Sequence, residues 1–357
     1  ISAVFIPTDP KAPVTLFLPE ASLIGLVVSA RQGMPVGFDR LRTFDLLNFC
    51  ATARAEDVHL SLPADLLAEL SEISARVDDV CAPDIIQGIA RCIAQTPGLA
   101  GQAVLFDDMR VATEVHRLCG HPCHDGLGVV MAARSIKTPE ELAILRESGV
   151  KADRVMAHTV SALRIGSSWA AVEKSVAHFM IDEGIDPLPN SPMLFGGSYD
   201  AIFKPDLFRT RFDTPFQGGE IAILETQGKY RNVWIDINRT AHLGRAPAAY
   251  REQHALVKRC FEEVAAKLRP GANSAEICQS ARDGLARELD APGKLLMIVH
   301  SIGRVPLESP VRYPGTGLHA AVEGFTIQPS MALSFDALYF GSRLGPSHME
   351  NVFIIGE

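Results

Sequence analysis

Side chains that bind metals or move protons stand at the ends of short apolar runs in the last third of this 357-residue chain. Glu225 follows Ile-Ala-Ile-Leu, and Asp236 lies in Val-Trp-Ile-Asp-Ile, after a turn predicted over residues 228–232. A hairpin of these two strands brings both carboxylates close together. Buried carboxylates are costly unless a cation, a proton or a hydrogen-bond donor compensates them. The alternative is that one acid pairs with Arg231 or Arg239.

Two more ionisable side chains extend this pattern. His300 follows the apolar run Leu-Leu-Met-Ile-Val and precedes Ser-Ile-Gly, and Glu350 opens the last predicted strand. Imidazole and carboxylate are common acid, base and metal-binding groups. We therefore predict one pocket whose catalytic residues are Glu225, Asp236, His300 and Glu350.

Three further residues are predicted to bind substrate in that pocket. Gln328 ends a predicted strand that starts at Gly324, and His348 lies two residues before Glu350. The turn Gly196-Gly-Ser-Tyr199 can offer backbone N–H groups or the Tyr199 hydroxyl to an anionic substrate. The alternative for this turn is a purely structural role without a ligand.

The elements that must position these side chains fall into two parts. The first part is residues 1–133. It mixes short apolar runs with helical stretches, which is typical of a small α/β domain. The apolar runs lie at 3–6, 14–18 and 23–28, and the helices are predicted around 63–75 and 84–95.

The second part, residues 134–357, begins at a clear helix start. Thr138 and Glu141 form a capping box, and a proline follows Thr138 at the first helical position. Further on, Leu163–Val172 resembles Leu268–Ile277, because each joins a helix ending in Leu-Arg-x-Gly to a capped second helix. This repeat predicts a duplicated domain with a pseudo-two-fold axis. The alternative is a coincidence of common helix-ending chemistry.

Composition excludes several classes of protein. With 47% hydrophobic and 21% charged residues the chain is globular, and its net charge of −8 includes no basic stripe for nucleic acid. No apolar run approaches the ~20 residues of a membrane span. Seven scattered cysteines suit reduced thiols in the cytoplasm. The chain begins at Ile1 within an apparent strand and without a methionine, so we expect the natural start to lie upstream.

These motifs make the second part resemble the pita-bread fold family of creatinase, aminopeptidase P and prolidase. Asp-Ile-Asn-Arg-Thr at Asp236 is similar to the family's Asp-Ile-Thr-Arg-Thr, and Val-His-Ser-Ile-Gly at His300 to its Gly-His-Gly-Ile-Gly. Thr-Ile-Gln-Pro-Ser at Gln328 stands where the family has Thr-Ile-Glu-Pro-Gly, and Glu350 matches the glutamate of Arg-x-Glu-Asp. Glu225 replaces a family aspartate.

The resemblance implies an α/β (α+β) chain with two domains. A creatinase-type N-terminal domain would cover residues 1–133, and a pita-bread catalytic domain with a pseudo-two-fold repeat would cover 134–357. It also implies a homodimer that acts on a small-molecule substrate.

The resemblance also bears on metal binding, because five positions carry metal ligands in the family. Gln328 offers a neutral oxygen where a carboxylate is needed. Glu225 moves its carboxylate by about one methylene, roughly 1.2–1.5 Å. We therefore expect no dinuclear centre and no cofactor, although a single divalent ion on Glu225, Asp236, His300 and Glu350 stays open. By the same logic Gln328→Glu should raise metal affinity.

The residues and the family resemblance together suggest three candidate functions. The first is creatinase-like hydrolysis of a C–N bond in a small metabolite, with His300 as acid or base and no dinuclear metal. The second is a metal-dependent Xaa-Pro aminopeptidase, dipeptidase or lyase. Against it, the outer histidines of the peptidases are absent, since Leu307 holds one position and residues 196–204 contain no histidine. The third is an inactive binding module, which the retained histidine and three acids disfavour.

Overall fold

The computed structural model describes residues 2–31, 37–46, 63–78, 81–188, 193–197, 213, 215–285, 288–312, 324–340 and 342–356. The chain divides into two compact units, Ile1–Gly128 and Val129–Glu357, a few residues before the boundary expected from the sequence. Among the described residues, no helix combines the length and the apolar character needed to span a membrane.

The first unit contains a three-stranded sheet in the order β1-β2-β3. Its strands are β1 (Ala3–Phe5), β2 (Thr15–Pro19) and β3 (Arg40–Phe44), and a separate parallel pair joins β4 (Val104–Phe106) to β5 (Cys123–Asp125). Its helices are α1 (Leu23–Arg31), α2 (Ala64–Ser74), α3 (Ile85–Gln95) and α4 (Met109–Cys119). Phe17 and Phe44 of the sheet share one apolar cluster with Ile89 and Ile93, so α3 packs against the strands.

One of the apolar runs, expected as a strand of the α/β domain, is a helix instead. The apolar run 23–28 forms the first part of α1, and Leu23 and Val27, four residues apart, are its buried side chains. Periodicity cannot separate strand from helix in so short an apolar run. The helices predicted around 63–75 and 84–95 are confirmed as α2 and α3.

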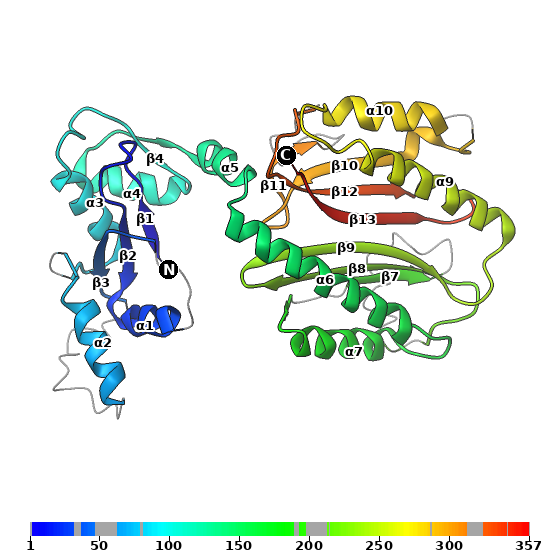
Figure 1. Ribbon diagram of the computed structural model, residues 1–357, viewed down its shortest axis with the longest axis horizontal. Coiled ribbons are helices and arrows are strands. Elements are labelled where there is room, and N and C mark those ends of the chain that lie inside the picture. The colour runs from blue at the N-terminus through cyan, green and yellow to red at the C-terminus, as the bar shows by residue number, and fades with distance from the viewer. Residues whose placement is uncertain are drawn as a thin grey trace. The chain divides into compact units, whose positions relative to one another are not determined.

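The second unit is built on one sheet. In the described part of the chain this sheet has eight strands in the order β11-β10-β12-β13-β9-β8-β6, with β7 also paired to β8 (Figure 1). The strands are β6 (Asp186–Pro187), β7 (Met193–Gly197), β8 (Ile221–Tyr230), β9 (Val233–His242), β10 (Leu295–Ser301), β11 (Glu308–Arg312), β12 (Ala332–Tyr339) and β13 (Ser347–Ile354). The helices are α5 (Leu127–Ser135), α6 (Pro139–Ala162), α7 (Trp169–Asp182), α9 (Ala248–Ala265) and α10 (Ser274–Leu285).

The predicted repeat is visible in the way each half begins. The helix pair α6–α7 precedes β8 and β9, and the pair α9–α10 precedes β10, β12 and β13 (Figure 1). Gly166 and Gly271, which end the two Leu-Arg-x-Gly segments, have φ values of 90° and 82°. Their N–H groups donate to equivalent carbonyls, those of Phe216 and Ile327, each at 2.9 Å. Phe216 in the first half therefore corresponds to Ile327 in the second.

Alternation along the strands gives the sheet two different faces, because successive side chains point to opposite sides. Met297, Val299 and Phe335 belong to a buried apolar cluster that includes residues of α9 and α10. Leu224 and Ile237 belong to a second one that includes residues of α6 and α7. One face is thus packed under the helices. The residues between these positions lie on the other face, and many of them are polar.

Candidate active site

The β8–β9 hairpin places the first two predicted acids. Its turn consists of Arg231 and Asn232, which have φ values of 49° and 62°, while Tyr230 pairs directly with Val233. Two central residues with positive φ form the tight turn that suits a two-residue hairpin. The turn predicted over 228–232 is therefore wrong, because both strands continue to the edge of this tight turn.

The register of the hairpin brings four polar residues to one face. Glu225 lies opposite Asn238, and Gln227 lies opposite Asp236. Residues directly opposite one another in an antiparallel pair share a face of the sheet. Glu225, Gln227, Asp236 and Asn238 therefore form one polar patch, which sequence reasoning described only in part.

Three further strands extend this patch. His300 on β10 lies opposite Ser334 on β12, and Asp336 on β12 lies opposite Glu350 on β13. Glu350 in turn lies opposite Asn238 on β9, so the polar residues form a continuous line across strands β10, β12, β13, β9 and β8. The structure thus brings together the four residues predicted to be catalytic.

Gln328 lies outside this patch. Its side chain is exposed, and it stands before the start of β12 rather than at the end of a strand. The strand predicted from Gly324 is wrong, since Thr326 makes only an isolated bridge to Asn273. The chain is instead tied to the loop before α10, where the Ile327 N–H donates to the Ala272 carbonyl at 2.9 Å.

Asp336 supplies the carboxylate that the motif comparison expects at position 328. Because Phe216 corresponds to Ile327, nine residues further along each half Glu225 corresponds to Asp336. Asp336 is buried between the strands that carry His300 and Glu350. Two signals in the sequence point to it. They are a lone acid in the apolar run Ala-Leu-Ser-Phe-Asp-Ala-Leu-Tyr and the repeat itself.

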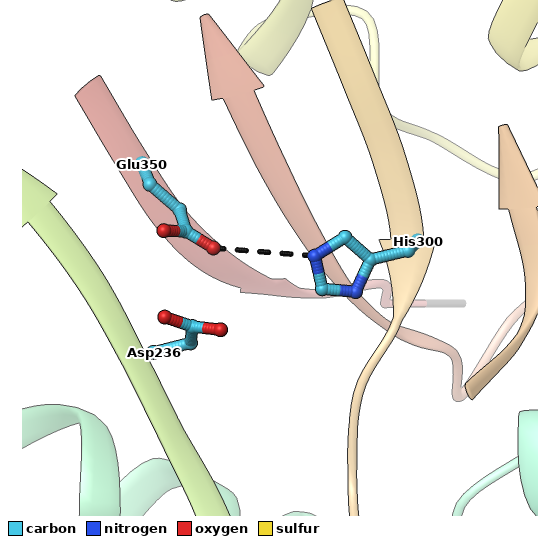
Figure 2. Close-up of side chains that lie close together, drawn as sticks. All are labelled: Asp236, His300 and Glu350. Carbon is cyan, nitrogen blue, oxygen red and sulfur yellow. Dashed lines mark ion pairs between the residues drawn. The ribbon is translucent and has the colours of Figure 1, made fainter. Parts of the chain in front are cut away.

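His300 is oriented by the backbone of its neighbour. Its Nδ1 lies 3.1 Å from the Ser301 carbonyl oxygen, and its Nε2 lies 3.7 Å from Asp336 Oδ2 and 4.0 Å from Glu350 Oε1. A hydrogen on Nδ1 that donates to the carbonyl leaves Nε2 as the reactive nitrogen. Figure 2 shows His300, Glu350 and Asp236 reaching toward one another from three strands.

Three other side chains hold the acids of the patch. The Gln227 amide nitrogen donates to Glu225 Oε1 at 2.9 Å. Ser334 Oγ donates to Glu350 Oε1 at 2.7 Å. His348, which was predicted to bind substrate, is buried with its Nε2 only 2.9 Å from Asp336 Oδ1.

The Arg239 side chain on β9 holds β13 in place, and with it Glu350. Arg239 Nη1 donates to the Glu350 carbonyl oxygen and Nη2 to Asn351 Oδ1, both at 2.8 Å. Arg231 Nη1 lies 3.7 Å from Glu147 Oε2. In the described part of the chain neither arginine forms an ion pair with Glu225 or Asp236, so neither of them compensates these carboxylates.

Crowding of buried carboxylates raises the pKa of most of them. Burial raises the pKa of Asp236 to about 8, and the negative charges of Glu225 and Asp336 add to this effect. Burial also raises the pKa of Glu350 well above its usual range, assisted by Asp236 and Asp336. Burial is also the main cause of the raised pKa of Glu225. The nearby imidazoles lower the pKa of Asp236 and Glu225 by less than burial raises it.

Asp336 behaves in the opposite way. Burial alone would raise its pKa, but the nearby imidazole of His300 and the hydrogen bond from His348 outweigh burial and lower the pKa to about 2. For His300, burial opposes the charged form, yet the nearby carboxylate of Asp336 raises its pKa overall. The site therefore contains one firmly ionised carboxylate among several that favour the protonated form.

The donor set fits a divalent cation. Ligand atoms of Asp236, His300 and Glu350 all lie within 4.8 Å of one another, and so do those of Asp336, His348 and Glu350. Carboxylate oxygen with imidazole nitrogen is a common ligand set for divalent first-row metals. A cation would compensate the carboxylates that otherwise repel one another. Tyr199, the remaining predicted substrate contact, lies outside the described residues.

Comparison with known proteins places this site in a family. Residues 143–357 match metallopeptidase family M24. The probable dipeptidase PepE of Mycobacterium tuberculosis (strain ATCC 25618 / H37Rv) is 26% identical over 360 residues, which cover 95% of this chain and 89% of that protein. An ectoine hydrolase of Halomonas elongata is 24% identical over 166 residues, which cover 44% of this chain and 40% of that protein. The crystal structure of dipeptidase PepE from Mycobacterium ulcerans has a TM-score of 0.67 and 19% identity, and the match covers 100% of this chain and 82% of that chain.

The chain belongs to metallopeptidase family M24, since the match covers more than half of it. The pita-bread fold expected from the resemblance is confirmed. The chain is therefore an enzyme, a hydrolase of C–N bonds. The inactive binding module, third among the functions drawn from the sequence, finds no support.

Proposed function

We propose that this M24 hydrolase cleaves a C–N bond in a small polar substrate with the help of a divalent cation bound to Asp236, His300 and Glu350. One observation carries the proposal: ligand atoms of these three buried side chains lie within 4.8 Å of one another. The sequence favours metal-free hydrolysis mainly because Gln328 matches a ligand position. That reason no longer holds, since Asp336 supplies a carboxylate in the site.

A bound divalent cation would polarise the scissile carbonyl and lower the pKa of an attacking water. The protein's own groups supply orientation and proton transfer. His300 is held through Nδ1 by the Ser301 carbonyl, so that Nε2 faces the site. Gln227 holds Oε1 of Glu225, and the second oxygen of Glu225 accepts the proton of the attacking water. Its raised pKa makes Glu225 a stronger base for that proton, which the carboxyl group then passes to the leaving nitrogen.

The substrate class follows from what the chain keeps and lacks. One relative of family M24 is named a probable dipeptidase and another an ectoine hydrolase, so small C–N bonded molecules are the shared class. The outer histidine that assists amide cleavage in the Xaa-Pro peptidases of the family is replaced by Leu307, which weighs against that reaction. We therefore favour a dipeptide without proline, or a small amide or amidine metabolite.

A second candidate is the creatinase-like, metal-free reaction with His300 as acid or base. The observation that favours it is the contact of His348 Nε2 with Asp336 Oδ1 at 2.9 Å, because an internal donor compensates this carboxylate without a cation. The two candidates share their residues and differ in metal dependence.

The test is hydrolysis by protein purified without chelators. Bound metal is measured by elemental analysis, and release of amine is measured on proline and non-proline dipeptides and on small cyclic amidines. We expect activity on a non-proline substrate that EDTA abolishes and manganese restores. Activity that survives complete removal of metal would instead establish the creatinase-like candidate. Activity confined to Xaa-Pro peptides would contradict the proposed substrate class.

A further inference from the structure

We propose that Gln227 restricts this site to a single cation, because its side-chain amide fills the space between Glu225 and Asp236 that a second ion would need. The inference rests on the proposed function, in that it concerns the cation of the same site. It assigns Gln227 a role in selecting the number of metal ions.

The position of the amide nitrogen carries this inference. Gln227 Nε2 lies 2.9 Å from Glu225 Oε1, 3.2 Å from Asp236 Oδ1 and 3.3 Å from Asp236 Oδ2. One –NH2 group therefore faces three carboxylate oxygens of two acids. A cation shared by the two acids would lie about 2.0–2.2 Å from such oxygens. An ion at that distance would overlap the volume that the amide group already occupies.

The backbone leaves Gln227 little freedom to move away. It sits in the middle of β8, directly opposite Asp236, and pairs with it across the tight hairpin. Its neighbours Thr226 and Gly228 point to the other face, where an added Cβ on Gly228 would lie 2.5 Å from Met180 Cε. This crowding under α7 keeps the strand in place. The Gln227 side chain is thus held on the face of the acids.

The chemistry of an amide also suits this role. Its two N–H groups compensate two carboxylates by hydrogen bonding and bring no charge of their own. The amide does not ionise, so it remains a hydrogen-bond donor throughout the physiological pH range. On the other side of Asp236, ligand atoms of Asp236, His300 and Glu350 can hold a single ion. The second group of ligand atoms, on Asp336, His348 and Glu350, shares Glu350 with the first, and His348 Nε2 already lies 2.9 Å from Asp336 Oδ1.

The inference is tested by isothermal titration of manganese chloride into chelator-treated protein. We expect one ion per wild-type chain and two ions per chain in Gln227→Ala and in Gln227→Ser, which both remove the amide. Gln328→Ala is the matched control, because its side chain is exposed, and it should bind one ion. Electron paramagnetic resonance of the titrated samples then separates isolated manganese ions from a coupled pair.

Each outcome bears on a different claim. Two ions in the wild-type chain would overturn the role of Gln227 and leave the proposed metal-assisted hydrolysis standing. One ion in the folded Gln227 variants, with circular dichroism unchanged, would also overturn it. Failure of the wild-type chain to bind any ion would instead refute the proposed function, and the inference with it.

Discussion

Asp336 on β12 lies directly opposite Glu350 on β13, so two carboxylates of neighbouring strands face one another on the polar side of the sheet. Their partners differ, because His348 contacts Asp336 whereas Ser334 donates to Glu350. The imidazole keeps Asp336 ionised, and burial favours a proton on Glu350. A pair of like charges is thus divided into one permanent anion and one carboxylate that a cation can deprotonate.

Removal of Asp336 should weaken metal binding. We expect Asp336→Asn to lower manganese affinity by about 10–100-fold, as for other groups that support metal ligands. From the sequence alone, Gln328→Glu is predicted to raise manganese affinity. In the structure the Gln328 side chain is exposed, so this variant should leave the affinity unchanged. Titration calorimetry compares the two variants. A gain of manganese affinity in Gln328→Glu without a loss in Asp336→Asn would instead identify position 328, and not Asp336, as the ligand position.

Replacement of His300 should abolish most of the activity and leave the fold intact. In the metal-assisted reaction His300→Gln removes a ligand of the cation. In the metal-free candidate it removes the acid or base, which contributes about 10²–10⁴-fold to kcat. The midpoint of thermal unfolding should stay close to that of the wild type, because glutamine is polar and of similar length. His178→Gln, which changes an exposed histidine, serves as the control and should lose nothing. Full activity of His300→Gln would exclude the proposed site.

The metal-free protein should lose stability as pH rises. Asp236 has its pKa raised from 3.8 to about 8 in the folded chain, so between these values the folded state holds a proton that the unfolded state has released. Stability therefore falls from about pH 4 to pH 8. Thermal unfolding of EDTA-treated protein at pH 5, 6, 7 and 8 measures this slope. Asp236→Asn, which cannot ionise, should flatten it, and an equal slope in that variant would contradict the assignment.

Glu308 should be important for stability. Its carboxylate is 1% exposed and lies 2.8 Å from Lys137 Nζ, whose side chain is 2% exposed, and it also pairs with Arg134. Glu308→Gln removes the partner of a buried cation and should cost about 3–5 kcal/mol of unfolding free energy. The exposed pair of Arg259 and Glu288 is the control, where Glu288→Gln should cost only about 0–1 kcal/mol. Urea denaturation measures both.

Much of the fold and site could be predicted because lone polar residues interrupt or end apolar runs. Glu225, Asp236, His300 and Glu350 are all visible in this way, and strand alternation brings them to one face. Asp336 shows the same signal, but a short motif match drew the expected acid to Gln328. Only alignment of the two halves corrects that choice. The homodimer, the cytoplasmic location and the exact domain boundary stay predictions.

Gln227 could not be predicted, for a physical reason. Its role depends on whether the hairpin turn has two residues or five, since the strand face alternates with every residue. Local sequence does not settle this, because Arg231 is an unusual residue for positive φ. Register is a property of the paired strands. The number of residues between them had to be seen in the structure.

The exposed tip of the β8–β9 hairpin constrains how this enzyme can be engineered or can diverge. Surface turns normally tolerate insertions and deletions. Here a single inserted residue at Arg231 or Asn232 would shift one strand against the other, and Asp236 would no longer face Gln227. Affinity tags, reporter peptides and cross-linking sites therefore belong elsewhere on the chain. Among homologues, the length of this tip should vary less than its amino-acid identity.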